Sequence, residues 1–183
     1  KGVCVSRHAL LNFLLGITRE PGLQAGDRLL AVTTLSFDIA ALELLAPLVA
    51  GATVVIAERD EAQDPRLLAR RITESRASVM QATPATWRAL LDAGWSAGPA
   101  FRIFCGGEAL GPDLAQRLME RGAELWNLYG PTETTVWSTC ARIEDPRAVT
   151  IGSPIANTSV YVVDGNLDVV PRGAVGELLI GGA

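Results

Sequence analysis

The sequence predicts a doubly wound, mostly parallel α/β sheet with helices on both faces, followed by a short antiparallel β segment. Two observations predict this fold class. Up to about residue 141, apolar strand-like runs alternate with helical segments of about 10–15 residues, which is the pattern of βαβ units. Beyond that point the helical period is lost and turn residues separate short strand-like runs. With 183 residues, 49% of them hydrophobic, the chain can build a folded core.

The first half of the chain carries clear helix boundaries. Ser6 is placed to cap the first helix, which ends near Pro21. Asp38 stands in a capping position before a second apolar helix, and Gly51 is a natural end for it. The elements predicted in this half are helices from about 6 to 21, 39 to 50 and 65 to 75, and strands over 27–32 and 54–56.

The second half continues the alternation until the helical pattern stops. Thr83-Pro84 combines a capping residue with proline at the first helical position. The elements predicted here are strands over 78–81, 102–105 and 124–128, helices over 84–93 and 112–121, and antiparallel strands over 159–163 and 178–180. Five parallel strands favour a flavodoxin-like sheet. We therefore expect one unit over residues 1–145 and a partial β unit over 146–183, both ends of the chain being cut.

Composition excludes several classes of protein. The net charge is −4 and the arginines are scattered, which argues against a nucleic-acid partner. The longest charge-free apolar run, 44–57, is too short to cross a bilayer, and the start resembles no signal peptide. Cys4, Cys105 and Cys140 are odd in number and far apart, and His8 is the single histidine, which predicts reduced thiols and no zinc site. A cytoplasmic protein without a membrane partner is expected.

Polar or glycine-rich segments follow four of the predicted strands. In an open parallel sheet, ligands bind beyond the carboxyl ends of the strands, so these segments should meet at one rim. They are residues 33–38, 81–84, 105–109 and 127–135. Turns have a similar composition for purely structural reasons, so an ordinary turn at Gly106-Gly107 remains an alternative.

The segment from Tyr129 to Thr135 carries the chemistry of a nucleotide site. Three threonine hydroxyls surround one carboxylate, Glu133, directly after a Gly130-Pro131 turn. Hydroxyls and backbone N–H groups can hold phosphate oxygens, and a carboxylate beside them can hold Mg²⁺. The ring of Tyr129 could stack on a planar base. The alternative is a capped turn with a solvated glutamate.

Residues 127–133 (Asn-Leu-Tyr-Gly-Pro-Thr-Glu) resemble the nucleotide-binding core motif of the adenylate-forming superfamily, and more narrowly of adenylation domains of nonribosomal peptide synthetases. Three further segments follow the family's order. Lys1-Gly2 resembles the end of the phosphate loop, 37–40 the motif that opens the amino-acid pocket, and 176–182 a later β motif. The resemblance spans all 183 residues as the middle of such a domain, and it assigns the final β segment to an incomplete β-barrel.

The resemblance implies an ATP-dependent ligase. An amino acid and ATP would give an aminoacyl adenylate and pyrophosphate, and the aminoacyl group would pass to a phosphopantetheine thiol on a peptidyl carrier domain of the same synthetase. Such synthetases serve secondary metabolism, including antibiotic biosynthesis. Thr132 would bind the α-phosphate and Glu133 would ligate Mg²⁺. The nucleotide-binding residues it implies are Gly107, Glu108, Ala109, Asn127, Tyr129, Gly130 and Thr132.

The same alignment of motifs implies an amino-acid pocket. Its lining would be Asp38, Ile39, Leu42, Gln81, Phe104, Gly106, Leu128, Val136 and Trp137. Asp38 would pair with the α-ammonium group, because a carboxylate at an apolar pocket needs a cationic partner. Leu42, Phe104 and Trp137 are large, so little volume remains and glycine, or at most alanine, is favoured. The alternative is that Asp38 only caps the following helix.

Two other functions remain open at this stage. An acyl- or aryl-CoA ligase of the same superfamily has no need for a carboxylate such as Asp38, and a flavodoxin-like interaction module would bind no nucleotide. We also expect the 183 residues alone to be inactive, because the family's lid lysine and ribose-binding aspartate would lie beyond Ala183, and Lys1 is the only lysine.

Overall fold

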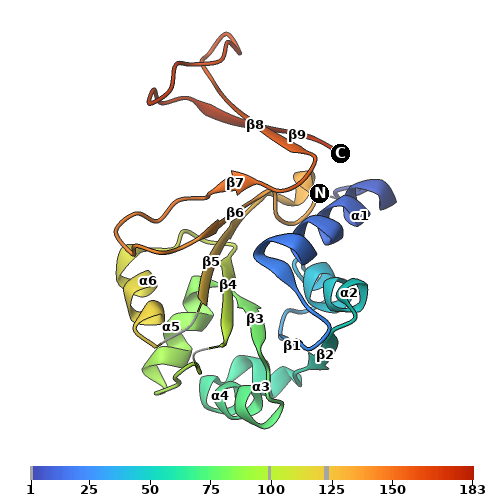
Figure 1. The fold of residues 1–183 in the computed structure, drawn as a ribbon, viewed down its shortest axis with the longest axis vertical. Coiled ribbons are helices and arrows are strands. Elements are labelled where there is room, and N and C mark those ends of the chain that lie inside the picture. Colours follow the sequence, from blue (N-terminus) through green and yellow to red (C-terminus); the bar gives the residue numbers. More distant parts are fainter. Residues whose placement is uncertain (1, 99, 122–123) are drawn as a thin grey trace.

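The computed structural model describes residues 2–98, 100–121 and 124–183, so Lys1 and its predicted phosphate-loop role lie outside the described residues. The chain forms an α/β body with a β hairpin projecting from it (Figure 1). The sheet of the body has the order β2-β1-β3-β4-β5-β6-β7, and the hairpin is β8-β9. The strands are β1 (Arg28–Ala31), β2 (Thr53–Ile56), β3 (Val79–Ala82), β4 (Arg102–Gly106), β5 (Glu124–Tyr129), β6 (Thr139–Arg142), β7 (Ser153–Pro154), β8 (Thr158–Val163) and β9 (Glu177–Gly182).

The first five strands are all parallel, whereas β6 and β7 add on in antiparallel fashion. This order is the flavodoxin-like one, and the separate antiparallel hairpin follows it, so the predicted fold class is confirmed. The seven-stranded sheet includes β7, which lies beyond the expected boundary at residue 145. A division at 145–146 would therefore cut the sheet between β6 and β7.

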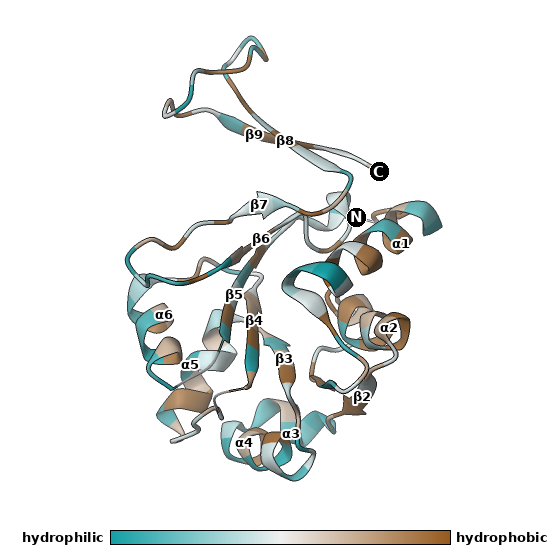
Figure 2. Ribbon diagram, viewed as in Figure 1, coloured by the Kyte–Doolittle hydropathy of each residue, from teal (hydrophilic) through white to brown (hydrophobic). Residues whose placement is uncertain are grey.

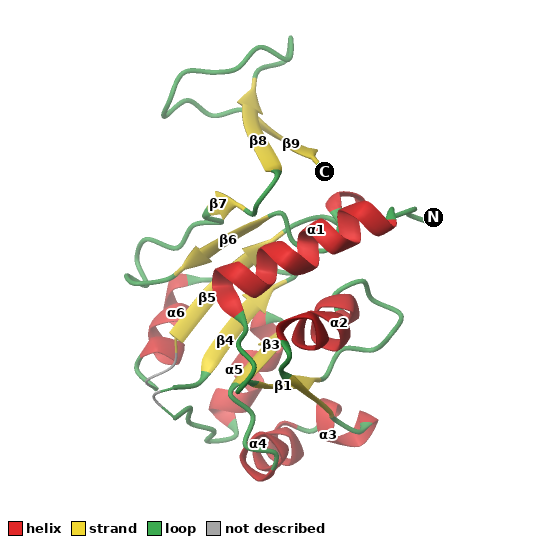
Figure 3. Ribbon diagram, turned by 45° about the vertical axis from the view of Figure 1, so that its right-hand side comes forward, coloured by secondary structure: helices red, strands yellow, loops and turns green. Residues whose placement is uncertain are grey.

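Helices cover both faces of the sheet (Figure 3). One face packs against α1 (Arg7–Ile17) and α2 (Ala40–Ala50). The other packs against α4 (Pro65–Glu74), α5 (Pro84–Asp92) and α6 (Pro112–Met119), with the short α3 (Arg59–Gln63) beside α4. Figure 2 shows polar and hydrophobic residues alternating along α1, whose Phe13, Leu14 and Ile17 are buried. Among the described residues no helix has the length and apolar character needed to cross a membrane.

Helix boundaries follow the predicted capping residues at three places. The Ser6 hydroxyl accepts a hydrogen bond from the Ala9 N–H at 3.0 Å, and the Thr83 hydroxyl does the same for Thr86 at 3.4 Å. Gly51 ends α2 with a φ of 70°, a left-handed conformation that favours glycine. The sequence analysis did not predict α3, which begins with a reciprocal capping box between Glu58 and Glu61.

An ion pair ties together the strand ends that lie opposite the predicted site. The carboxylate of Asp27 accepts hydrogen bonds from the Arg102 guanidinium, from the Ser78 hydroxyl at 2.9 Å and from the Gln24 N–H at 2.7 Å. These groups stand just before or at the start of β1, β3 and β4. Burial acts to raise the pKa of Asp27, but the hydrogen bonds from Arg102, Gln24 and Ser78 outweigh it, so the pKa is lowered.

Replacing Asp27 by asparagine is expected to lower the free energy of unfolding at neutral pH by about 1–3 kcal/mol, because a largely buried charge pair loses one partner. Since folding lowers the pKa of Asp27, its contribution is present above the unfolded pKa of about 4 and is lost as the pH falls through the folded-state pKa. Urea titrations of the chain and of Asp27→Asn should therefore converge in acid.

The matched control is Asp113→Asn, which breaks an exposed ion pair with Arg88 and should cost much less. Urea titrations in which the stabilities of the chain and Asp27→Asn stay equally far apart at every pH would contradict this role of Asp27.

Candidate active site

The carboxyl ends of β3, β4 and β5 bring four predicted pocket residues together. Gln81 is paired with Phe104 across β3 and β4, and Gly106 is paired with Leu128 across β4 and β5. Residues paired in this way point to the same face, and Phe104 and Gly106 share that face because they are two apart on one strand. All four are buried, on the face covered by α1 and α2.

Trp137 packs against this group of residues and contacts both Gly106 and Gln81. A Cβ at Gly106 would lie 2.7 Å from the Cη2 atom of Trp137, so the indole ring packs directly on this glycine. The indole Nε1–H donates a hydrogen bond of 2.8 Å to Oε1 of Gln81. Trp137 is only 2% exposed, so the ring fills the space that a side chain at residue 106 would otherwise take.

The remaining apolar pocket residues lie in the same cluster. Leu42, on α2, is fully buried and belongs to the apolar core that contains Val136 and Trp137. Ile39 packs against that core, and its Cδ1 atom would be 3.8 Å from a Cβ at Gly107. The structure therefore gathers the apolar members of the predicted pocket around one end of the sheet.

Asp38 and Thr132 line one cavity of about 210 Å³, together with residues of α1 and its entry. The two predicted halves of the site are thus on the same side of the sheet. The alternative that Asp38 caps α2 is wrong, because the helix begins at Ala40 and its N-cap residue, Ile39, makes no side-chain capping bond. Among the described residues nothing donates a hydrogen bond to the Asp38 carboxylate, which remains available for a ligand.

The turn after β5 is held in place by its own backbone. A Cβ at Gly130 would lie 2.7 Å from the backbone of residues 136–138, so only glycine fits. The Ser138 N–H donates to the Tyr129 carbonyl at 2.8 Å. The Thr134 hydroxyl is 2.6 Å from that of Ser138 and donates to the carbonyl of Pro131, so it is committed to the turn.

Two β-branched residues in this turn adopt left-handed backbone conformations. Thr135 has a φ of 68° and Val136 a φ of 65°. Such conformations cost about 1–3 kcal/mol each and persist where the surroundings impose them, often at functional sites. Both residues line the cavity that also contains Asp38 and Thr132.

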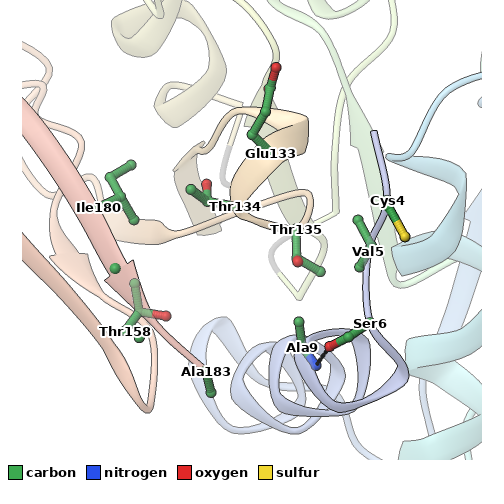
Figure 4. Close-up of a pocket in the computed structure, with 12 residues that line it drawn as sticks. Cys4, Val5, Ser6, Ala9, Glu133, Thr134, Thr135, Thr158, Ile180 and Ala183 are labelled. Atoms are coloured by element: carbon green, nitrogen blue, oxygen red, sulfur yellow. Dashed lines mark hydrogen bonds between the residues drawn. The ribbon is translucent and has the colours of Figure 1, made fainter. Parts of the chain in front are cut away.

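Glu133 lies at a second cavity of about 310 Å³, shown in Figure 4. Thr134 and Thr135 line this cavity too, as do Ser6 at the start of α1 and Gly181 of β9. Among the described residues no group of three acidic, histidine or cysteine side chains could hold a metal ion without help. A lone carboxylate beside hydroxyls fits Mg²⁺, which takes one or two carboxylates and fills its other positions with water and phosphate oxygens.

The residues predicted to surround a nucleotide base lie next to the pocket residues but, within the described part of the chain, do not line a single cavity. Asn127 and Tyr129 are on β5, beside the end of β4 that leads into Gly107. The Asn127 side-chain amide donates to the Thr150 carbonyl at 2.8 Å, and Tyr129 is 39% exposed. Glu108 and Ala109 line a separate hollow against α5. Their predicted nucleotide role stays a prediction.

The buried thiols are unsuited to nucleophilic catalysis. Burial raises the pKa of Cys105 to about 12, with a smaller contribution from the charge of Glu108. Burial likewise raises the pKa of Cys140 to about 11, with a contribution from Glu20. Both thiols stay protonated near neutral pH, and Cys105 is a fully buried residue of β4.

The sequence analysis did not place Val5, Ser6 or Glu43 in the site. Ser6 and Val5 line both cavities, and Glu43 of α2 bonds to Gln81 inside the pocket cluster. The capping role of Ser6 was predictable, but its place at the cavities depends on how α1 crosses the sheet edge. A glutamate in an apolar helix is a visible signal for Glu43, since such a residue is rarely buried without a partner.

The family model for AMP-binding enzymes matches residues 1–183. Over its full length the chain is 47% identical to a dimodular nonribosomal peptide synthase of Bacillus subtilis (strain 168), of which it covers 8%. It is 43% identical to the PKS-NRPS hybrid synthetase ATPKS of Aspergillus niger and 39% identical to tyrocidine synthase 3 of Brevibacillus parabrevis, again over its full length, and covers 10% and 3% of them. The chain thus spans a tenth or less of these three relatives.

The solved structures that match this chain include two that align with its whole length. One is the four-domain nonribosomal peptide synthetase holo-AB3403, bound to AMP and glycine, with a TM-score of 0.96 and 46% identity; the chain covers 14% of it. The other is the nonribosomal peptide synthetase FmoA3, with a TM-score of 0.90 and 29% identity, of which 21% is covered. The resemblance to nonribosomal peptide synthetases that the motifs indicate is confirmed, and the chain belongs to the family of AMP-binding enzymes.

Proposed function

We propose that this chain is the central part of an adenylation domain that activates a small amino acid, glycine, with ATP. The observation that carries the proposal is the cavity shared by Asp38 and Thr132. One aminoacyl adenylate reaches both groups only if they lie on the same side of the sheet. The carboxylate then meets the ammonium end of the ligand, and the threonine meets its phosphate end.

Asp38 supports an amino acid over a fatty or aryl acid. It is partly buried beside apolar residues of α2, and nothing among the described residues donates to its carboxylate. A carboxylate in such surroundings gains most from a cationic partner. The α-ammonium of an amino acid is that partner, whereas an acid that lacks the amino group would leave the charge uncompensated.

The filled side-chain pocket supports glycine. Leu42 and Phe104 are fully buried, and Trp137 packs on Gly106 without a gap. A larger substrate side chain would overlap one of these groups. One relative at 46% identity is described as bound to AMP and glycine, which agrees with this assignment. Exclusion of alanine rests on one methyl group, so we expect discrimination of roughly 10–200-fold at best.

The turn of residues 129–135 supports the phosphate end of the site. Thr132 is exposed, and no hydrogen bond within the described residues occupies its hydroxyl, so it is available to a phosphate oxygen. Glu133 would hold Mg²⁺, which when bound neutralises charge on the phosphates. The proposed chemistry is attack of the amino-acid carboxylate on the α-phosphorus with loss of pyrophosphate.

This reaction needs positioning and charge neutralisation rather than a protein nucleophile. The raised pKa values of Cys105 and Cys140 agree with that. In the complete synthetase the aminoacyl group would then pass to the phosphopantetheine thiol of a carrier domain. That partner is proposed from the family and from relatives many times longer than this chain.

Replacing Asp38 by alanine in an adenylation domain that contains this chain should raise the KM for glycine roughly 10–100-fold, the worth of a charged hydrogen-bonded pair. The KM for ATP should change little, because Asp38 does not contact the nucleotide in this proposal. Glycine-dependent pyrophosphate exchange measures both constants. Asp113→Ala, which removes an exposed carboxylate outside the cavity that Asp38 lines, is the control. Equal increases of both KM values would refute the ammonium role.

Enlarging the pocket should admit larger amino acids. Trp137→Ala and Leu42→Ala are each expected to raise kcat/KM for valine or leucine relative to glycine at least about tenfold, since roughly 1.4 kcal/mol of overlap is relieved. Each variant should also lose about 2–5 kcal/mol of stability through the cavity left behind.

The matched control is Trp95→Ala, which empties a tryptophan site on the opposite face of the sheet. It should lower stability without changing the preference among amino acids. If valine and leucine stay at background with both pocket variants, the pocket assignment is wrong.

A further inference from the structure

A buried carboxylate stands behind the pocket without a cationic partner. Glu43 of α2 is 0% exposed, and no ion pair joins it to any described residue. Burial raises the pKa of Glu43, and hydrogen bonds from Thr33, Val32 and Gln81 act against this rise. A buried, uncompensated carboxylate is costly, so each hydrogen bond that it accepts matters.

Glu43 accepts four hydrogen bonds, two at each oxygen. Oε2 takes the backbone N–H groups of Val32 at 2.8 Å and Thr33 at 2.9 Å, which anchors α2 to the end of β1. Oε1 takes the Thr33 hydroxyl at 2.6 Å and the side-chain amide of Gln81 at 3.3 Å. The first three bonds are local to the loop after β1. The fourth reaches across to β3, into the predicted pocket.

Gln81 is hydrogen-bonded to both Glu43 and Trp137. Its Nε2 donates to Glu43, and its Oε1 accepts from the indole N–H at 2.8 Å. An indole N–H can only donate, so the amide oxygen of Gln81 must face Trp137 and its NH₂ group must face Glu43. All three side chains are buried, so water does not compete for these bonds.

We propose that Glu43 is a positioning residue for substrate selection: through Gln81 it fixes the Trp137 indole against Gly106 and thereby sets the size of the amino-acid pocket. This inference rests on the proposed function, which makes Trp137 a wall of that pocket. It adds a residue outside the pocket lining that determines which substrate is accepted.

The decisive variant is Glu43→Gln, which keeps the shape of the side chain. Its carbonyl oxygen can still accept from the N–H groups of Val32 and Thr33, but its NH₂ group then faces the NH₂ group of Gln81. Turning Gln81 over relieves that clash only by aiming its NH₂ at the indole N–H of Trp137. The variant should raise kcat/KM for alanine relative to glycine about 5–10-fold, the worth of one buried hydrogen bond.

An exchanged pair restores the two hydrogen bonds of residue 81. In the double variant Glu43→Gln with Gln81→Glu, the new amide at residue 43 donates to a carboxylate at residue 81, which still accepts from Trp137. The alanine-to-glycine ratio should return to within about twofold of the wild-type ratio, because the effect of residue 43 acts through residue 81; a double-mutant cycle measures this coupling. Thr33→Ala is the matched control, because it removes one bond to the same Oε1 atom of Glu43 but leaves the bond from Gln81.

The measurements are pyrophosphate exchange with glycine and alanine, and thermal unfolding, on the full-length synthetase that contains this chain. Thr33→Ala should lower the unfolding temperature and leave the ratio unchanged. The proposal is overturned if Glu43→Gln leaves the ratio unchanged, if Thr33→Ala shifts it equally, or if the exchanged pair fails to restore it. Insolubility of both Glu43→Gln and the exchanged pair also overturns it, because the exchanged pair keeps both hydrogen bonds of residue 81.

The wild-type enzyme separates this proposal from the proposed function. If it activates an amino acid other than glycine, the substrate assignment fails. The role of Glu43 is then judged by the same criteria, with the ratio taken between the amino acid that is activated and its homologue with one more methylene group.

Discussion

The site depends on the return of the chain after β5. At Gly130 the backbone passes so close to residues 136–138 that no side chain fits, and the Ser138 N–H closes the loop onto the strand. One backbone path therefore fixes two things. It carries Thr132 to the cavity that contains Asp38, and it lays Trp137 over the end of β4. The phosphate end and the side-chain end of the proposed ligand site share a single structural origin.

This return is energetically strained, and the surroundings offset the strain. The left-handed conformations of Thr135 and Val136 cost about 1–3 kcal/mol each. Burial of Val136 and Trp137 stabilises the segment by a comparable amount, since a fully buried large apolar side chain contributes about 1.5–3 kcal/mol. The hydrogen bond that Trp137 donates to Gln81 adds a directional constraint on the ring that burial alone does not supply.

The sequence was enough to predict the fold class and the rim, because these follow from local signals and topology. Ser6 and Gly51 act through neighbours within one helical turn, and parallel strands must end on the same edge. The helix-cap alternative for Asp38 failed because α2 starts two residues later. The left-handed turn and the bonds of Glu43 were out of reach, since they depend on partners distant in the sequence, such as Gln81.

The hydrogen bonds that join Glu43, Gln81 and Trp137 lie at the proposed apolar pocket for a physical reason. A pocket that rejects substrates by overlap discriminates only as well as its walls resist displacement. In the proposed pocket, the wall at Gly106 is backbone held in the sheet, and the wall at Leu42 is a fully buried side chain on a packed helix. Trp137 has the largest side chain in the wall of the proposed pocket, and it directly follows a strained turn. A hydrogen bond to a side chain that is itself anchored from behind restrains the ring where displacement would enlarge the pocket most.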